Sequence, residues 1–135
     1  MGVYTGIAKD NVTINSGRAA LDVLGFTSAS FGQVTQTTDK ATSVTLNTIT
    51  GRITMNDASL SSNSAVDFML MNDKIGLNNL VLVNVSGGGT AGAYVASVCC
   101  VQAGGVRIKL QNIKGGALSE PVQVLFAVIK VGHDG

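Results

Sequence analysis

The most constraining feature of the chain is a pair of contrasting patterns in its last third. Residues 106–111, VRIKLQ, strictly alternate apolar and polar side chains, which is the pattern of a strand with one buried face. Residues 122–131, VQVLFAVIKV, are apolar at almost every position, so a strand formed here carries apolar side chains on both faces. Both faces of such a strand must be covered, either by the same chain or by a partner subunit.

One face of this run is assigned to the core, and the other side chains of the run are candidate contacts with a neighbouring subunit. Val124, Phe126 and Val128 follow the core phase. The candidate interface residues are Val122, Leu125, Ala127, Ile129 and Val131.

From Lys40 onward, short segments with apolar residues spaced by two are separated by clusters of Gly, Asn, Asp and Ser. They predict seven strands, at about 41–48, 51–56, 64–72, 79–86, 93–102, 105–113 and 121–131. Because the connections are short and no helical pattern is long enough for a crossover, we expect an all-β fold, an antiparallel β-sandwich or jelly-roll-like domain. The predicted core comprises Val44, Leu46, Ile53, Met55, Val66, Phe68, Leu70, Leu80, Leu82, Val106, Ile108, Leu110, Val124, Phe126 and Val128.

The first part of the chain has a different character. Residues 3–7 and 12–14 are short strand-like pieces, residues 17–26 fit either a helical turn or a short strand, and residues 33–39 form a polar connector. We therefore expect an extended N-terminal arm or attachment segment at residues 1–35 and a β-sandwich domain at residues 36–135.

Composition argues against several classes of partner. The chain is 45% hydrophobic and 13% charged, with a formal net charge of +1, and its basic residues are scattered. It therefore lacks the basic patch of a nucleic-acid-binding protein.

No apolar run reaches membrane-spanning length, and the first ten residues lack the apolar core of a signal peptide, so we expect neither a membrane association nor export by that route. The adjacent Cys99 and Cys100 are predicted to be reduced and buried, as in a protein that folds in a reducing cytoplasm.

The glycine-rich stretch 87–92, GGGTAG, matches the dinucleotide-binding pattern G-x-G-x-x-G. That pattern requires a helix at the glycines and an acidic residue about twenty positions later. Here a strand-like segment follows, and residues 105–115 contain no acid. The stretch is therefore predicted to be a flexible hairpin loop, and Gly88, Gly89, Thr90 and Ala91 are candidate contacts with a partner.

No arrangement of residues predicts catalysis, a metal site or a cofactor. The single histidine, His133, lies three residues from a Gly-ended tail, and the acidic residues are isolated and mostly in turns. The loops at 56–64 and 72–79 each offer one carboxylate, too few for calcium. We expect a protein that is not an enzyme, with no catalytic residues, no metal and no cofactor.

Five segments together resemble one family. They are residues 42–47 (TSVTLN), 51–56 (GRITMN), 88–94 (GGTAGAY), 105–113 (GVRIKLQNI) and 115–130 (GGALSEPVQVLFAVIK), with 66–72 and 81–84 between them. In this pattern, which covers about residues 36–131, the chain resembles a family of small tailed-phage and prophage virion proteins.

The resemblance implies a head decoration (cement), head-fibre or tail-fibre component, generally a β-sandwich module and often a trimer. Its leading implication is a non-enzymatic decoration protein that folds in the host cytoplasm, resides in the virion and binds the major capsid protein and copies of itself. A receptor-binding or glycan-binding module of a tail fibre or head fibre is the alternative. A glycan-cleaving sandwich domain is a third hypothesis.

Overall fold

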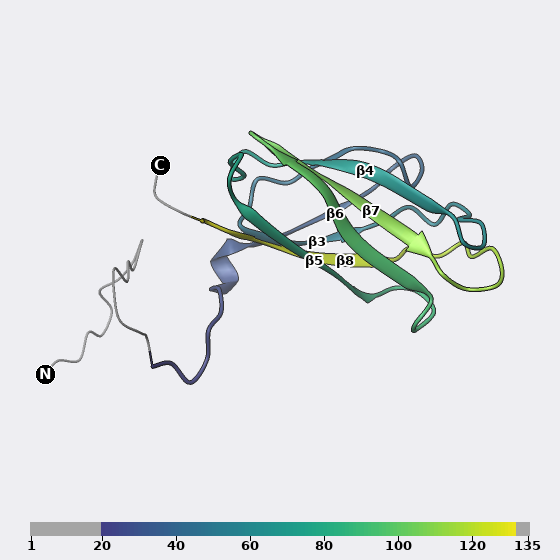
Figure 1. The fold of residues 1–135 in the computed structure, drawn as a ribbon, viewed down its shortest axis with the longest axis horizontal. Coiled ribbons are helices and arrows are strands. Elements are labelled where there is room, and N and C mark those ends of the chain that lie inside the picture. The colour runs from purple at the N-terminus through teal and green to yellow at the C-terminus, as the bar shows by residue number, and fades with distance from the viewer. Residues whose placement is uncertain (1–19, 132–135) are drawn as a thin grey trace, which may run out of the picture.

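Two four-stranded sheets pack face to face in the computed structural model, which describes residues 20–131 (Figure 1). The first sheet has the order β1-β3-β8-β5 and the second β2-β4-β7-β6. The strands are β1 (Phe31–Thr35), β2 (Val44–Thr45), β3 (Thr50–Thr54), β4 (Ala65–Met71), β5 (Leu80–Gly87), β6 (Tyr94–Gln102), β7 (Gly105–Asn112) and β8 (Gln123–Ile129). The all-β sandwich expected from the sequence is confirmed. The predictions for residues 3–7, 12–14 and His133 lie outside the described residues.

From β1 to β6, each strand lies in the sheet opposite to that of the strand before it. This alternation brings β1 beside β3 and β2 beside β4, and both pairs are parallel. The connection between each parallel pair is a strand of the other sheet rather than a helix. The sheets are therefore mixed, whereas the sequence led us to expect purely antiparallel ones.

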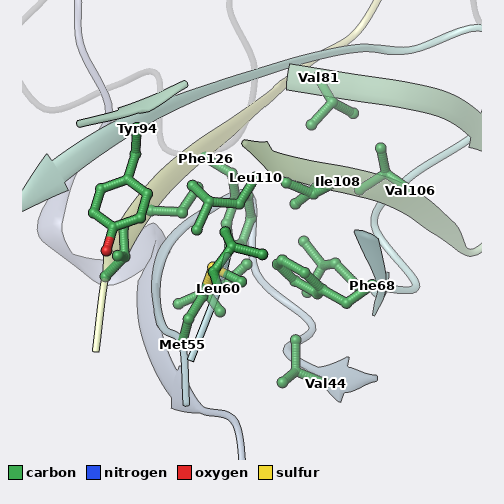
Figure 2. Packing of buried hydrophobic residues seen from close by; sticks show 14 of the residues in the cluster. Val44, Met55, Leu60, Phe68, Val81, Tyr94, Val106, Ile108, Leu110 and Phe126 are labelled. Atoms are coloured by element: carbon green, nitrogen blue, oxygen red, sulfur yellow. The ribbon is translucent and has the colours of Figure 1, made fainter. Parts of the chain in front are cut away.

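Apolar side chains from the inner faces of both sheets meet in one core (Figure 2). Phe68, Ile108 and Leu110 come from the second sheet, and Ile53 and Phe126 from the first. The core positions predicted on β3, β4, β7 and β8 are buried, with Leu46 and Val66 partly buried against them. The strict alternation in residues 106–111 thus identified the inner face of β7 correctly.

The predicted phase of β5 is wrong. Leu80 and Leu82 are 48% and 52% exposed, whereas Val81 between them is 6% exposed and belongs to the core. Every residue from 80 to 83 is apolar, so the pattern gives no phase. Pairing with β8 determines it, because Val81 lies opposite the buried Val128 and Leu82 opposite Ala127.

The sandwich begins before the expected boundary at residue 36. Phe31 to Thr35 form β1, which pairs with β3 at the edge of the first sheet, so part of the predicted connector at 33–39 is a strand. Its polar residues Gln33 and Thr35 are exposed, which explains why the segment resembles a loop in sequence. A short 3-10 helix, η1 (Ser28–Ser30), precedes β1, and residues 20–26 form neither a helix nor a strand.

The fully buried Asn112 fastens the connection between β7 and β8. Its amide nitrogen donates to the carbonyl oxygens of Leu60 and Gly116, both at 2.9 Å, and its Oδ1 accepts from the backbone amide of Lys114. One side chain therefore satisfies three backbone groups in two loops.

Within residues 20–131, no helix has the length and apolar character needed to cross a membrane.

Candidate interaction surface

The outer faces of the two sheets differ in chemistry. The second sheet presents Asp67 from β4 and Arg107 and Lys109 from β7. Arg107 and Asp67 form an exposed ion pair, with 2.7 Å between Nη1 and Oδ1. Met71 and Val95 are also exposed on this face, at separate positions. A mixture of charged and single apolar side chains has the character of an ordinary solvated surface.

The first sheet presents apolar side chains instead. In the pairing of β5 with β8, Leu80 lies opposite Ile129, Leu82 opposite Ala127 and Asn84 opposite Leu125. We call Leu80, Leu82, Leu125, Ala127 and Ile129 the apolar stripe. The two β5 leucines are exposed and the three β8 residues are half-buried.

A cationic side chain borders the apolar stripe. Arg52 on β3 lies opposite Leu125, and its guanidinium carbon is 5.7 Å from the centre of the Phe31 ring. Its Nε is buried and has no hydrogen-bond partner among residues 20–131. A buried donor left in this state costs about 1–3 kcal/mol.

The structure places the candidate interface residues in two environments. Leu125, Ala127 and Ile129 lie on the outer face of the first sheet, and the exposed Val131 follows β8. Val122, in contrast, is fully buried in the core and is not available to a partner. It has the same phase as Val124, so alternation turns it inward. The sequence reasoning missed Leu80 and Leu82, whose part in this surface follows from the β5–β8 pairing.

The glycine-rich loop between β5 and β6 is held by Glu120. Its carboxylate accepts from the backbone amide and the hydroxyl of Thr90, both at 2.9 Å, and from the Tyr94 hydroxyl at 2.8 Å. The hydrogen bond from the Thr90 backbone amide, followed by that from Tyr94, lowers the pKa of Glu120. Burial and the adjacent Glu120 raise the pKa of Tyr94. The loop is therefore fastened at its centre rather than freely flexible. It is also not a hairpin, because β5 and β6 lie in different sheets.

The four candidate loop residues, Gly88, Gly89, Thr90 and Ala91, are all exposed. With Val85, Ser86 and Tyr94, the loop lines a hollow of about 360 Å³. Gly88 has a positive φ of 77°, and a Cβ at this position would lie 2.3 Å from the Pro121 carbonyl oxygen. The loop thus packs its backbone directly against the segment before β8.

Lys40 connects two loops at the same end of the sandwich. The residue is buried, and its ammonium group donates to the carbonyl oxygens of Asn56 and Glu120. Burial lowers the pKa of Lys40, against the opposing effect of the Asp57 and Glu120 carboxylates. Two loops from distant parts of the sequence are therefore held by one side chain, which the sequence pattern did not single out.

Cys99 and Cys100 are exposed, so the prediction that they are buried is wrong. The pairing of β6 with β7 shifts by one residue between Val98 and Cys100, which is the position of a β-bulge. Beyond it, Cys100 lies opposite Arg107 on the outer face of the second sheet. An apolar run in the sequence does not reveal such a shift.

Within the described part of the chain, no group of three or more His, Cys, Asp or Glu side chains is arranged to hold a metal ion. Comparisons of the sequence with protein-family models and with curated proteins, and of the structure with solved structures, found no match.

Proposed function

We propose that the chain is a non-enzymatic virion structural protein, a decoration or cement protein that binds a phage head as a trimer. The observation that carries the proposal is the contrast between the two outer faces. One carries charged groups and separate exposed apolar residues, and the other bears a contiguous apolar stripe that residues 20–131 leave exposed at Leu80 and Leu82 and half-buried on β8. Contiguous apolar surface of this kind is typical of a site for protein association.

The resemblance to small tailed-phage virion proteins supplies the class of partner. Its motif GGTAGAY contains Thr90 and Tyr94, which both donate hydrogen bonds to Glu120 of the motif LSE. The motifs therefore maintain the shape of one end of the sandwich rather than a reactive centre. This is the role expected in a protein whose function is assembly.

The location of the chain in an intact particle tests the proposal. Particles of the phage or prophage that encodes the chain would be labelled with an antibody raised against the purified protein. Label distributed over the head supports a decoration protein. Label confined to the tail supports the fibre alternative, and particles that contain none of the chain would overturn a virion function altogether.

Binding to empty heads provides an independent measurement. Expanded shells lacking the chain would be mixed with purified protein, sedimented, and heated in a melting experiment. We expect saturable co-sedimentation and a higher melting temperature of the shell. Shells that neither bind the protein nor gain stability would contradict a role in cementing the head.

The hollow beside loop 87–92 favours a second function, recognition of a glycan. It is lined by the hydroxyl-bearing side chains of Ser86 and Thr90 and by Tyr94. A glycan array probed with the wild type and with Thr90→Val tests this function. Binding lost in the variant supports it, and an array without bound glycans contradicts it.

A further inference from the structure

The segment before η1 is apolar and uncovered. Leu21, Val23, Leu24 and Phe26 are 61%, 82%, 88% and 52% exposed. In Figure 1 this purple segment leaves β1 through η1 and runs away from both sheets. We call residues 21–26 the arm segment. Four exposed apolar side chains within six residues are unusual for a surface that faces water alone.

Local hydrogen bonds hold the exit of the arm segment from the sandwich. The Thr50 hydroxyl donates to the Ser30 carbonyl oxygen at 3.1 Å, and the Ser30 hydroxyl donates to the Thr27 carbonyl oxygen at 2.8 Å. These contacts anchor η1 to β3 beside the edge strand β1. The arm segment is therefore presented away from the sandwich to which it is attached.

The arm segment complements the outer face of the first sheet. Its sequence, LDVLGF, is apolar except for one carboxylate, Asp22. Arg52 borders the apolar stripe on the β3 side and has no ion-pair partner within residues 20–131. Lys130 borders its end at Ile129, and the Lys130 ammonium group donates to Lys74 and Asn79. In extended form, six residues span about 20 Å, whereas the four strands of a sheet span about 14 Å, so the arm segment is long enough to cross the face.

We propose that the arm segment of one copy of this chain lies across the apolar stripe of a second copy, with Asp22 of the first paired to Arg52 of the second. The inference deepens the proposed function by naming the contact that joins the subunits. It rests on that function only for the number of subunits in the oligomer, which is three. Each subunit binds one neighbour through its arm segment and another through its apolar stripe, which is a heterologous contact. Such contacts close into a ring when the rotation from one subunit to the next completes a full turn.

The test uses two variants of the full chain, Leu24→Asp in the arm segment and Leu82→Asp in the apolar stripe. Both positions are exposed, so both variants should melt cooperatively near the wild-type temperature. Light scattering coupled to size exclusion should show an oligomer for the wild type and a monomer for each variant. Leu77→Asp and Val95→Asp, which place the same charge at other exposed apolar positions, should leave the oligomer intact.

Mixing the two variants separates contact between copies from contact within one copy. The intact arm of Leu82→Asp can bind the intact face of Leu24→Asp, so an equimolar mixture should give a one-to-one dimer. If each arm binds its own face, mixing changes nothing and the inference is wrong.

Charge reversal tests the assigned pair. Asp22→Arg and Arg52→Asp should each weaken association about tenfold or more, and the double variant should recover most of the loss. Failure of the double variant to recover overturns the pairing. An oligomer that survives Leu24→Asp overturns the arm contact while leaving the proposed trimer in place. A wild type that is monomeric in solution also overturns the arm contact, and binding to empty heads then decides the proposed function separately.

Discussion

Glu120 accepts two hydrogen bonds from Thr90, one from the backbone amide and one from the hydroxyl, each at 2.9 Å. The pair joins the segment that precedes β8 to the loop between β5 and β6. Because the same carboxylate accepts from Tyr94, one charge organises this end of the sandwich. These bonds favour the ionised form of Glu120 and lower its pKa in the folded protein.

This shift predicts a pH-dependent effect of Glu120→Gln. The ordinary pKa of the group is 4.5, and it is lower in the folded state, so its stabilising contribution is present above that pH and lost as the pH falls through the folded pKa. The melting temperature of Glu120→Gln should therefore be lower than that of the wild type at pH 7, and the difference should shrink as the pH falls below 4.5. Asp73→Asn, in an exposed loop, is the control. A difference independent of pH would contradict the ionic role.

Gly88→Ala should destabilise the protein more than Gly92→Ala. Both glycines have a φ of 77°, which costs an alanine about 1–2 kcal/mol. A Cβ at Gly92 has no neighbour within 4 Å, whereas one at Gly88 would lie 2.3 Å from the Pro121 carbonyl oxygen. We expect a loss of about 3 kcal/mol at Gly88, measured by urea unfolding. Equal losses would show that the loop moves away from Pro121 easily.

Adjacent residues on β8 should separate folding from assembly. Val128 is in the core, and an unpaired buried charge there should cost about 3–5 kcal/mol, so Val128→Asp should abolish or severely weaken folding. Ile129 lies on the outer face, so Ile129→Asp should keep a cooperative melting transition and lose self-association or head binding. Circular dichroism and light scattering measure the two effects. Equal loss of folding in both variants would mean that the chain itself covers both faces.

Asn112→Ala should cost about 2–3 kcal/mol, because it removes three hydrogen bonds to backbone groups. The Leu60 carbonyl oxygen keeps its bond from the Leu118 amide, whereas the Gly116 carbonyl oxygen and the Lys114 amide lose the partner that Asn112 supplies. Hydrogen exchange should accelerate in residues 113–118 before it does so in β7. Asn84→Ala, at an exposed position on β5, should change the free energy of unfolding by less than about 0.5 kcal/mol. Similar effects at both positions would contradict the anchoring role of Asn112.

Sequence alternation predicted the inner faces of β4 and β7 because polar residues mark their outer faces, as in Val66-Asp67-Phe68. The inner face of β8 was also predicted correctly, although Gln123 is the only polar residue in that strand. It failed for β5, where Leu80 to Val83 are apolar in both phases. It also failed for β1, an edge strand whose exposed Gln33 and Thr35 resemble a connector. Periodicity identifies a face only where the two faces differ in chemistry.

The candidate surface was predicted in part. The excess of apolar residues in 122–131 indicated a second face on β8, and Leu125, Ala127 and Ile129 lie there. Leu80, Leu82 and Arg52 join them through strand pairing, which links residues more than forty positions apart. The contact between Glu120 and Thr90 was missed for the same reason. A pattern within one segment carries no information about which distant segment it will meet.

The alternation of strands between the two sheets also governs the order in which this chain can fold. β3 and β5, which flank β8, cannot be completed until β8 has left the ribosome, because Thr50 pairs with Ala127 and Leu80 with Ile129. Within the described residues, the β6–β7 hairpin pairs neighbouring strands and can form earlier, as can the parallel pairs β1–β3 and β2–β4. With so much pairing between distant segments, we expect folding in milliseconds to seconds. During synthesis, the edge of β5 that pairs with β8 remains unpaired, and we expect the nascent chain to be prone to aggregation for that interval.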